Sequence, residues 1–323
     1  MNRFRPLLAA ACCAAALTAT LAAPGPASAQ QKTYTIGVSI PAADHGWTGG
    51  VDYFAQAAID RLGKTYPNLK FVLATAGDPG KQASDLEDML ATRNIDALVI
   101  LPTDPDPLTS PIKRVKDAGK FVTVVDRKLS QSGIEDLYVA GDNPGLGRTA
   151  GEYFKSKFPS GANIVVLRGL PIPIDKERVD AFNAAIAGTG IKVLGSQFAN
   201  WNRDDGFKVM QDFLSRFPKI DAVWAQDDDI ALGAIEAIKQ SGRTDQMWIV
   251  GGGGMKQTVK QVMDGDKMVP IDVGYDPGMI GTAIELTALR FEGGVPVRGR
   301  FILASPMITK ANASEFYHPD TPY

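Results

Sequence analysis

The chain has 323 residues, 45% of them hydrophobic, and its 34 Lys and Arg nearly balance 36 Asp and Glu, for a formal net charge of −2. This balance gives no basic surface of the kind that nucleic acids require. The mixed composition, with no low-complexity stretch beyond the first residues, also argues against a disordered chain.

Residues 1–29 have the pattern of a secretory signal peptide. Arg3 and Arg5 precede an apolar run over residues 7–23, prolines at 24 and 26 interrupt it, and residues 27–29 (Ala-Ser-Ala) suit a cleavage site. The run is short for a membrane span, and no later segment approaches the roughly 20 apolar residues that a spanning helix needs. We therefore expect an exported protein of about 294 residues, enough for two domains or one large one.

Both cysteines, Cys12 and Cys13, lie inside this segment. The mature chain would then have no thiol and no disulfide. An alternative is a lipid anchor, because Ala9-Ala10-Ala11-Cys12 loosely resembles a lipoprotein cleavage site. Against it, Cys12 comes so early that almost no apolar run precedes it.

After the signal segment, short apolar strands alternate with amphipathic helices, a pattern typical of right-handed βαβ units around a parallel sheet. The alternation restarts after Ala140, so we predict two α/β lobes with a parallel sheet each. The first set comprises strands 34–40, 69–74, 96–101, 121–125 and 137–140, with helices from Trp47 through Leu62, after Pro79-Gly80 through Leu90, and over 108–118. The second set comprises strands 162–167, 192–198, 220–225, 247–250 and 269–273, with helices 175–186, 203–217, 229–240 and 259–263 and one more, capped by Asn143 with Pro144 as its first residue.

Polar residues follow several strands of the first set, namely residues 44–47, Thr103-Asp104 and Asp126-Arg127. The carboxyl ends of parallel strands share one edge of a sheet, where open α/β sheets bind ligands. Asp126 accepts hydrogen bonds and Arg127 donates a planar fork of them, so the pair suits a polyhydroxylated molecule. Two alternatives stay open: Asp126 and Arg127 form only a surface ion pair, and Asp104 only caps the next helix.

The second set carries a similar ambiguity at Trp201 and at three consecutive aspartates. Trp201 either staples the start of the next helix or faces the crevice. The run Asp227-Asp228-Asp229 suggests calcium, but acids before a helix more often cap it and complement its dipole. We assign Asp228 and Asp229 to that role and leave Asp227 for the crevice.

Cofactor and catalytic chemistry find little support in the sequence. The run Gly251–Gly254 lacks the third glycine of a dinucleotide fingerprint and the Gly-Lys-Ser/Thr ending of a P-loop. Lys256, at a helix start, leaves a phosphorylated sugar open, although a surface lysine fits as well. His45 and His318 are far apart in sequence, so no metal site or nucleophile is indicated. We expect neither an enzyme nor a cofactor.

Several motifs, taken in order, resemble type I periplasmic sugar-binding proteins, close to the ribose-binding branch of ABC-importer receptors. The resemblance runs from about residue 34 to about residue 310. Its motifs are Ile100-Leu-Pro-Thr-Asp104, Thr123-Val-Val-Asp126-Arg127, Glu177-Arg178 followed by Phe182, Ala225-Gln226-Asp227-Asp228 before Ala231-Leu-Gly233, and Asp276-Pro277 before Ile280-Gly281.

The resemblance implies two lobes joined by three crossing strands, with a monosaccharide bound between them. The N-terminal lobe would comprise residues 31–140 and 277–304, and the C-terminal lobe residues 141–276 and 305–323. The ligand contacts implied by position are His45, Trp47, Asp126 and Arg127 in the first lobe, Arg178, Trp201 and Asp227 in the second, and Tyr275 at the last crossing. Alternatives remain: His45 as a helix-entry residue, Arg178 in a surface pair with Glu177, and Tyr275 as a hinge-packing aromatic.

The chemistry of a sugar suits these residues. A sugar ring has apolar faces and a polar rim, so Trp47 and Trp201 from opposite lobes would sandwich it while charged groups bind its edge. Two departures from the resemblance widen the choice of ligand. Residues 251–254 are glycines where relatives commonly have an aspartate, and Asp227 stands where the ribose-binding branch has asparagine. Another pentose, a hexose, a deoxysugar or an acyclic polyol therefore fits as well as ribose.

The first functional hypothesis is a monomeric periplasmic solute-binding protein that closes over a monosaccharide or polyol and delivers it to the membrane permease of an ABC importer. The alternative is a receptor subunit of the same fold that serves a chemoreceptor or sensor kinase. A sugar-responsive repressor is disfavoured, because the signal segment occupies the place of its DNA-binding helices. An exported hydrolase or dehydrogenase lacks an acid/base pair or a cofactor motif.

Overall fold

The computed structural model describes residues 32–323, and residues 33–323 form one compact unit. The predicted signal peptide and both cysteines lie outside the described residues. The sequence-based prediction of two α/β lobes with parallel sheets is confirmed by the two main sheets of the structure. Within residues 32–323, the search for a helix both long and apolar enough to span a bilayer found none.

The first lobe is built on a six-stranded sheet in the order β11-β5-β4-β3-β1-β2, in which every neighbouring pair is parallel. Its central strands are almost fully buried, which explains their unbroken runs of β-branched and other apolar residues. Its strands are β1 (Tyr34–Pro41), β2 (Leu69–Ala76), β3 (Ala97–Ile100), β4 (Phe121–Val125), β5 (Leu137–Gly141) and β11 (Gly299–Leu303).

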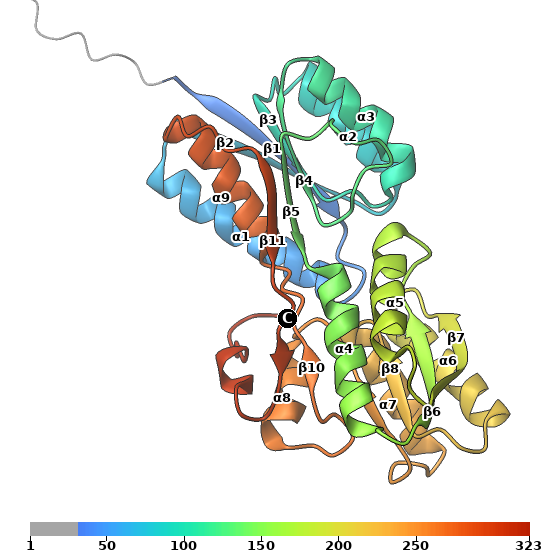
Figure 1. Cartoon of the computed structure of the whole chain (residues 1–323). Coiled ribbons are helices and arrows are strands. Elements are labelled where there is room, and N and C mark those ends of the chain that lie inside the picture. Colours follow the sequence, from blue (N-terminus) through green and yellow to red (C-terminus); the bar gives the residue numbers. More distant parts are fainter. Residues whose placement is uncertain (1–31) are drawn as a thin grey trace, which may run out of the picture. The chain divides into compact units, whose positions relative to one another are not determined.

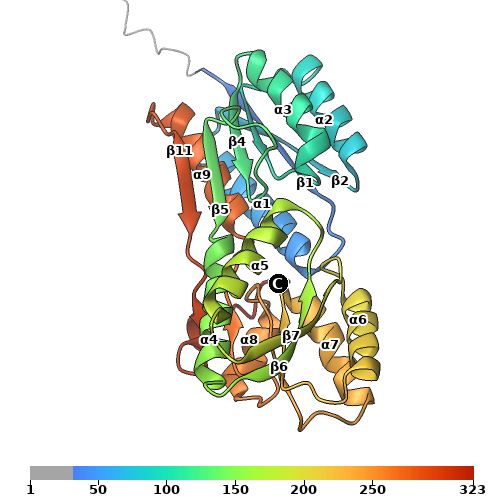
Figure 2. The same ribbon diagram turned by 45° about the vertical axis from the view of Figure 1, so that its right-hand side comes forward.

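Helices cover both faces of this sheet (Figures 1 and 2). On one face α1 (Gly46–Thr65) packs with α9 (Met279–Glu292), and on the other α2 (Pro79–Ala91) packs with α3 (Pro105–Asp117). The sequence analysis did not predict α9 or β11. Both follow the second lobe in the chain yet belong to the first, so the chain crosses between lobes more than once.

The second lobe contains a four-stranded parallel sheet in the order β7-β6-β8-β9. Helices α4 and α5 pack together, as do α6 and α7. The elements are α4 (Asn143–Lys157), β6 (Ala162–Arg168), α5 (Pro173–Ile186), β7 (Ile191–Phe198), α6 (Arg203–Arg216), β8 (Ala222–Ala225), α7 (Asp228–Gln240), β9 (Trp248–Val250), α8 (Lys256–Asp264) and a short 3₁₀ helix (Ala313–Glu315).

The last predicted strand, 269–273, was wrong in its length and its partner. Only β10 (Asp272–Val273) forms, and it pairs antiparallel with β12 (Met307–Ile308) in a separate two-stranded sheet. Pro270 has no N–H to donate to a ladder, so the preceding residues cannot extend the strand. A single parallel bridge, between Gly253 and Gly274, links this segment to the glycine run after β9.

Three segments cross between the lobes side by side: the end of β5, the link from β10 to α9, and the link from β11 to β12. The amide of Asp142 donates to the carbonyl of Leu303 at 2.9 Å, and the amide of Gly274 donates to the carbonyl of Pro306 at 2.9 Å. These hydrogen bonds tie the crossings into one hinge. The lobe boundaries given by the resemblance, 31–140 with 277–304 and 141–276 with 305–323, stay a prediction.

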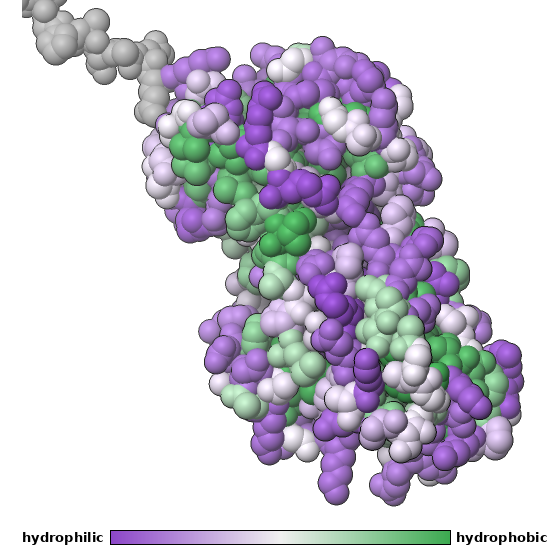
Figure 3. Space-filling model, in the orientation of Figure 1, coloured by the Kyte–Doolittle hydropathy of each residue, from purple (hydrophilic) through white to green (hydrophobic). Residues whose placement is uncertain are grey.

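The surface facing the viewer in Figure 3 is mostly hydrophilic, with hydrophobic side chains gathered over β11. Phe301 and Ile302 of this edge strand are 47% and 46% exposed. Most other large apolar side chains fill the space between the sheets and their helices, so each lobe has a packed hydrophobic core.

Candidate functional site

All the ligand-binding residues predicted from the sequence line one cavity between the two lobes, which encloses about 330 Å³ of empty space including its open part. Most of them lie in loops at the carboxyl ends of strands, as the sheet-edge argument predicts. The lining residues are His45, Trp47, Asp126, Arg127, Ile174, Arg178, Trp201, Asp227, Gly252, Gly253 and Tyr275. That they bind a ligand remains a prediction.

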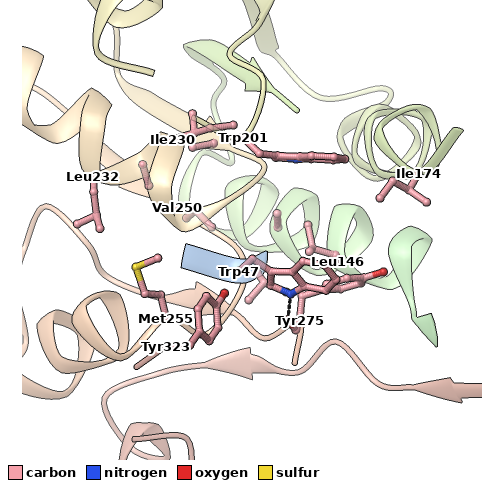
Figure 4. Close-up of a cluster of buried hydrophobic side chains, with 14 of the residues drawn as sticks. Trp47, Leu146, Ile174, Trp201, Ile230, Leu232, Val250, Met255, Tyr275 and Tyr323 are labelled. Carbon is pink, nitrogen blue, oxygen red and sulfur yellow. Dashed lines mark hydrogen bonds between the residues drawn. The ribbon is translucent and has the colours of Figure 1, made fainter. Parts of the chain in front are cut away.

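Two indole rings form opposite walls of this cavity. Figure 4 shows Trp201 on one side of an open gap and Trp47, with Tyr275, on the other. Nε1 of Trp47 donates to the carbonyl of Tyr275 at 2.9 Å, which fixes the orientation of the ring. Trp201 lies so close to Gly169 that a Cβ there would sit 2.0 Å from Nε1, so only glycine leaves room for this ring.

The backbone is strained at two of these residues. Asp126 has φ of 59° and Trp201 has φ of 53°, in the left-handed region that residues other than glycine rarely enter. Such a conformation costs on the order of 1–3 kcal/mol and persists only where the surroundings impose it. At Asp126 the neighbouring strand does so, because its amide donates to the carbonyl of Val139 and its carbonyl accepts from the Tyr138 hydroxyl at 2.5 Å. Strain of this kind concentrates at functional sites.

Asp126 and Arg127 are not a surface ion pair, because they are 1% and 5% exposed. Nε of Arg127 lies 3.8 Å from Oδ2 of Asp126, while Nη1 donates to the carbonyls of Pro102 and Thr103 at 3.0 and 2.5 Å. Burial lowers the pKa of Arg127, and the charge of Asp126 counters the effect. Within the described residues, Nε of Arg127 has no hydrogen-bond partner, so a donor is left for a molecule in the cavity.

Arg178 projects from α5 into the cavity rather than onto the surface. It is 5% exposed, its Nε donates to Oδ1 of Asn143 at 2.8 Å, and its Nη1 donates to the carbonyl of Gln226 at 2.9 Å. Its guanidinium also lies 4.4 Å from the ring centre of Tyr275. The alternative of a surface pair with Glu177 is wrong, since Glu177 forms its ion pair with Lys128 of the first lobe.

The division of roles among the three consecutive aspartates was partly wrong. Asp227 is itself the N-cap of α7, accepting from the amide of Ile230 at 3.0 Å, and it also lines the cavity. Asp228 accepts instead from the amides of Gly252 and Met255. One oxygen of an N-cap carboxyl can accept from a free amide of the first helical turn while the other faces away from the helix. A single aspartate can therefore cap α7 and line the cavity.

Asp229, the third aspartate of this run, contacts other residues of the protein. Asp229 accepts from the amide of Gly46 at 2.7 Å and pairs with Arg203 at 2.8 Å. In residues 32–323, no group of three or more acidic, histidine or cysteine side chains is arranged to hold a metal ion. Through its contacts with Gly46 and Arg203, Asp229 joins α7 to α1 and α6.

Burial gives Asp227 unusual proton chemistry. It raises the pKa of this carboxyl to about 7, with smaller opposing and reinforcing effects from His45 and Asp229. Half of the carboxyls would therefore carry a proton near neutral pH. The group can accept hydrogen bonds from ligand hydroxyls once ionised, and it can donate one when protonated.

His45 combines both roles that the sequence left open. It is the N-cap residue of α1, with its amide donating to Oγ1 of Thr48 at 3.2 Å, and its ring lines the cavity. Nδ1 lies 2.6 Å from Oδ1 of Asp44, and this hydrogen bond lowers the pKa of Asp44 to about 2. Because Nδ1 faces a carboxylate, Nε2 is the nitrogen left to serve a ligand.

Two other sequence candidates have structural partners away from the cavity. Asp104 is the N-cap of α3 and accepts from the amide of Asp106 at 3.1 Å. Lys256 donates to the carbonyl of Pro319 at 3.1 Å and to that of Thr321, so it anchors the tail of the chain. Asn143, predicted as a helix cap, is instead the first residue of α4; Asp142 is the cap, and the Asn143 side chain is left to hold Arg178.

Sequence reasoning missed Ile174 and left the glycines at 252 and 253 without a definite place. The predicted helix began at Asp175, but α5 begins at Pro173, and its first turn carries Ile174 into the cavity wall. Proline is favoured at the first helical position. The Pro171-Ile-Pro173 sequence could have signalled this earlier start.

Known proteins resemble this chain along most of its length. A family model described as a periplasmic binding protein domain matches residues 36–290. The ribose import binding protein of Escherichia coli is 32% identical over 257 residues, which cover 79% of this chain and 84% of that protein. The xylitol-binding protein of Mycolicibacterium smegmatis is 28% identical, covering 94% of this chain and 85% of its own.

Among solved structures, the fructose-binding periplasmic domain of a hybrid two-component system superposes with a TM-score of 0.79 at 29% identity. The match covers 88% of this chain and 93% of that chain.

Proposed function

Because the chain belongs to the periplasmic binding protein family, as a non-enzymatic type I sugar-binding protein, we propose that it is the solute-binding component of an ABC importer. Its ligand is a monosaccharide or polyol held in the cavity between the lobes. The observation that carries this proposal is the pairing of two indole walls, Trp47 and Trp201, with charged groups at the rim of one cavity. Aromatic faces stack on the C–H faces of a sugar while its hydroxyls meet the rim.

Unused hydrogen-bond donors support a polar ligand. Nε of Arg127 and Nε1 of Trp201 are buried and have no partner among the described residues. Leaving such donors unpaired costs free energy, which a ligand that pairs them recovers. Each hydrogen bond to a charged group contributes about 1.5–3 kcal/mol, so a few of them with stacking suffice for the roughly 8 kcal/mol of a micromolar complex.

A neutral ligand fits the charge of the cavity better than an anion or a cation. Arg127 and Arg178 face Asp126 and Asp227, so positive and negative groups are nearly balanced. A neutral polyol meets both donors and acceptors without adding an unpaired buried charge. The name of the xylitol-binding relative supports an acyclic polyol as one choice, and that of the ribose import protein supports a pentose.

Two contacts outside the cavity join the lobes and would stabilise the closed form. Lys128 after β4 pairs with Glu177 of α5, and the amide of Gly46 in α1 donates to Asp229 of α7. Both contacts require the lobes to be close together. Ligand binding would favour this arrangement by joining Trp47, Asp126 and Arg127 to Arg178, Trp201 and Asp227.

The proposal includes export through the predicted signal peptide, action in the periplasm as a monomer, and delivery to a membrane permease. A second candidate is a receptor subunit for a sensor kinase or chemoreceptor, favoured by the fructose-binding domain of a two-component system among the matching structures. Deleting the gene separates the two. Loss of ligand uptake supports import, whereas normal uptake with lost transcriptional or chemotactic response supports the receptor.

A thermal-shift screen of the mature protein tests the ligand class. It compares D-ribose, D-fructose, D-allose, xylitol, erythritol and myo-inositol with D-ribose 5-phosphate and D-galacturonate. A ligand at 100 times its Kd stabilises the bound state by about 2.7 kcal/mol, so a rise in Tm with a neutral member is expected. A rise with only the anionic members would overturn the proposal.

A further inference from the structure

Gln82 is a buried polar residue of α2 that lies outside the lining of the cavity. Its side chain is 0% exposed and makes three hydrogen bonds. Nε2 donates to Oγ of Ser39 at 3.1 Å and to the carbonyl of Leu101 at 3.0 Å, and Oε1 accepts from the amide of Thr103 at 2.7 Å. Gln82 therefore holds the loop between β3 and α3 at two points.

The same loop holds Arg127. Nη1 of Arg127 donates to the carbonyls of Pro102 and Thr103 at 3.0 and 2.5 Å. The carbonyl of Pro102 and the amide of Thr103 belong to one peptide unit, which is trans, as are the others in the described residues. A trans peptide is planar, and its C=O and N–H point in opposite directions. This one unit thus reaches Gln82 with its N–H and Arg127 with its C=O.

The hydrogen bond to Gln82 fixes the rotation of this peptide unit. If Oε1 were removed, the amide of Thr103 would be left without its partner, and a buried donor of this kind is costly. Rotation of the unit toward another acceptor would turn the carbonyl of Pro102 away from Nη1 of Arg127. Hydrogen bonds in such a chain also polarise one another, so the bond to Gln82 strengthens the one to the guanidinium.

The orientation of the Arg127 guanidinium matters because the group is planar and rigid. Anchoring Nη1 therefore also sets the direction in which the Nε–H points. Nε is buried, has no partner among residues 32–323, and belongs to a residue that lines the cavity. The guanidinium also lies 5.5 Å from the ring centre of Trp201, on the second lobe. A turn of this group would change both its free donor and its contact with the opposite wall.

We infer that Gln82 is a positioning residue of the candidate site, which acts through the Pro102–Thr103 peptide to hold Arg127 in the orientation that presents Nε to the ligand. The inference rests on the proposed function. It adds a residue outside the cavity on which ligand affinity depends, because a donor that is already oriented loses less conformational freedom on binding.

The variant Gln82→Met keeps the length of the side chain and removes its hydrogen bonds. Thr123→Val is the matched control, since it removes a buried hydroxyl of the same lobe that lies 2.7 Å from Oγ1 of Thr287 and away from the cavity lining. Calorimetric titration with D-ribose, D-fructose, xylitol and myo-inositol gives the affinities. We expect both variants to lower the Tm of the ligand-free protein, while only Gln82→Met weakens the tightest probe, by about tenfold.

A double variant distinguishes positioning of Arg127 from a general effect on the lobe. If Gln82 acts through Arg127, its replacement should matter only while the guanidinium is present. Gln82→Met combined with Arg127→Ala should therefore bind as weakly as Arg127→Ala alone. A further tenfold loss in the double variant would mean that the two residues act independently, and the inference would be wrong.

The conservative variant Gln82→Glu provides a rescue. Its carboxyl still accepts from the amide of Thr103, so the peptide unit and Arg127 should keep their orientation. An ionised carboxyl cannot donate to the carbonyl of Leu101, so the ligand-free Tm should fall. We expect an affinity close to that of the unaltered protein despite this lower Tm. A loss as large as that of Gln82→Met would contradict the role of the Thr103 amide.

These outcomes separate the inference from the proposed function. If Gln82→Met binds the tightest probe as well as the unaltered protein does, while Arg127→Ala binds it poorly, only the inference is overturned. If none of the four neutral probes binds the unaltered protein, the proposed function itself fails.

Discussion

The hydroxyl of Tyr275 donates a hydrogen bond to Oδ1 of Asp126 in the interior of the protein. Tyr275 lies at the crossing that follows β10, and Asp126 directly follows β4, so this bond joins the hinge to the first lobe. Burial raises the pKa of Tyr275 well above its usual value, which keeps the proton on the donor. The residue is thus both a cavity wall and a hinge contact.

Tyr275→Phe should destabilise the ligand-free protein. The change leaves Oδ1 of Asp126, a residue 1% exposed, without its donor, and an unsatisfied buried acceptor costs about 1–3 kcal/mol. Urea unfolding measures the loss. Tyr53→Phe, at a ring 40% exposed, is the control and should change little. Equal stability of both variants would show that the Tyr275 hydroxyl contributes nothing to the hinge.

Asp227→Asn should alter how stability depends on pH. The pKa of Asp227 in the folded protein is about 7, above its unfolded value of 3.8, so its stabilising contribution is complete below about pH 4 and is lost as pH rises through 7. Above pH 7, ionising the buried carboxyl costs the unaltered protein on the order of 4 kcal/mol of stability, and asparagine avoids this cost. Asparagine can still cap α7.

Urea unfolding at several values between pH 4 and pH 8 follows this difference. The free energy of unfolding of the variant, relative to that of the unaltered protein, should increase with pH. Asp228, whose pKa burial raises to about 6, acts in the same direction in both proteins, so the test rests on the difference between the two pH profiles. Parallel pH profiles would contradict the assignment of this titration to Asp227.

Trp201→Phe should weaken ligand binding about tenfold, because it removes the unpartnered Nε1 and shortens the stacking face. Calorimetric titration measures the change. Trp248→Phe provides the comparison, since Trp248 stacks on Phe158 with ring centres 5.3 Å apart and does not line the cavity. The Trp248→Phe variant should lower the stability of the protein and leave its ligand affinity unchanged. Similar affinities for both variants would remove Trp201 from the ligand contacts.

Glu177→Lys should speed ligand release by opposing closure. The ion pair with Lys128 is partly exposed, with side chains 39% and 26% accessible for Lys128 and Glu177, so we expect an effect of about 0.2–1 kcal/mol that shrinks at high salt. Stopped-flow measurement of dissociation tests this. Asp180→Lys, which breaks the Lys176–Asp180 pair on the same helix, is the control. The double exchange Lys128→Glu with Glu177→Lys should restore much of the loss, and failure to do so would point to a cause other than the pair.

The alternation of strands and helices was readable from the sequence because buried parallel strands and amphipathic helices have different periods. The prediction was poorest where tertiary context decides. Pro270 shortens the last strand of the second set, and β11, whose residues are mostly exposed, has no distinctive apolar pattern. Helix α9 is apolar over most of its surface and gives a weak periodicity, although it packs against α1.

The candidate site was predictable to the extent that its residues follow strands. Asp126 and Arg127 directly follow β4 of the first sheet, and Asp227 follows β8 of the second, so each lies at the carboxyl edge of its own sheet. Sequence could not show that Asp227 serves as cap and cavity wall at once, since that depends on where each of its two oxygens points.

The most direct test of the account is calorimetric titration of the unaltered protein and of Arg127→Ala with the neutral sugar or polyol that gives the largest thermal shift. Arg127 offers the cavity an unpaired Nε and lies at its charged rim. We predict one ligand per chain for the unaltered protein and a loss of affinity of about 100-fold or more for the variant, with cooperative unfolding retained. Equal affinity of the two proteins would show that the ligand binds somewhere other than this cavity.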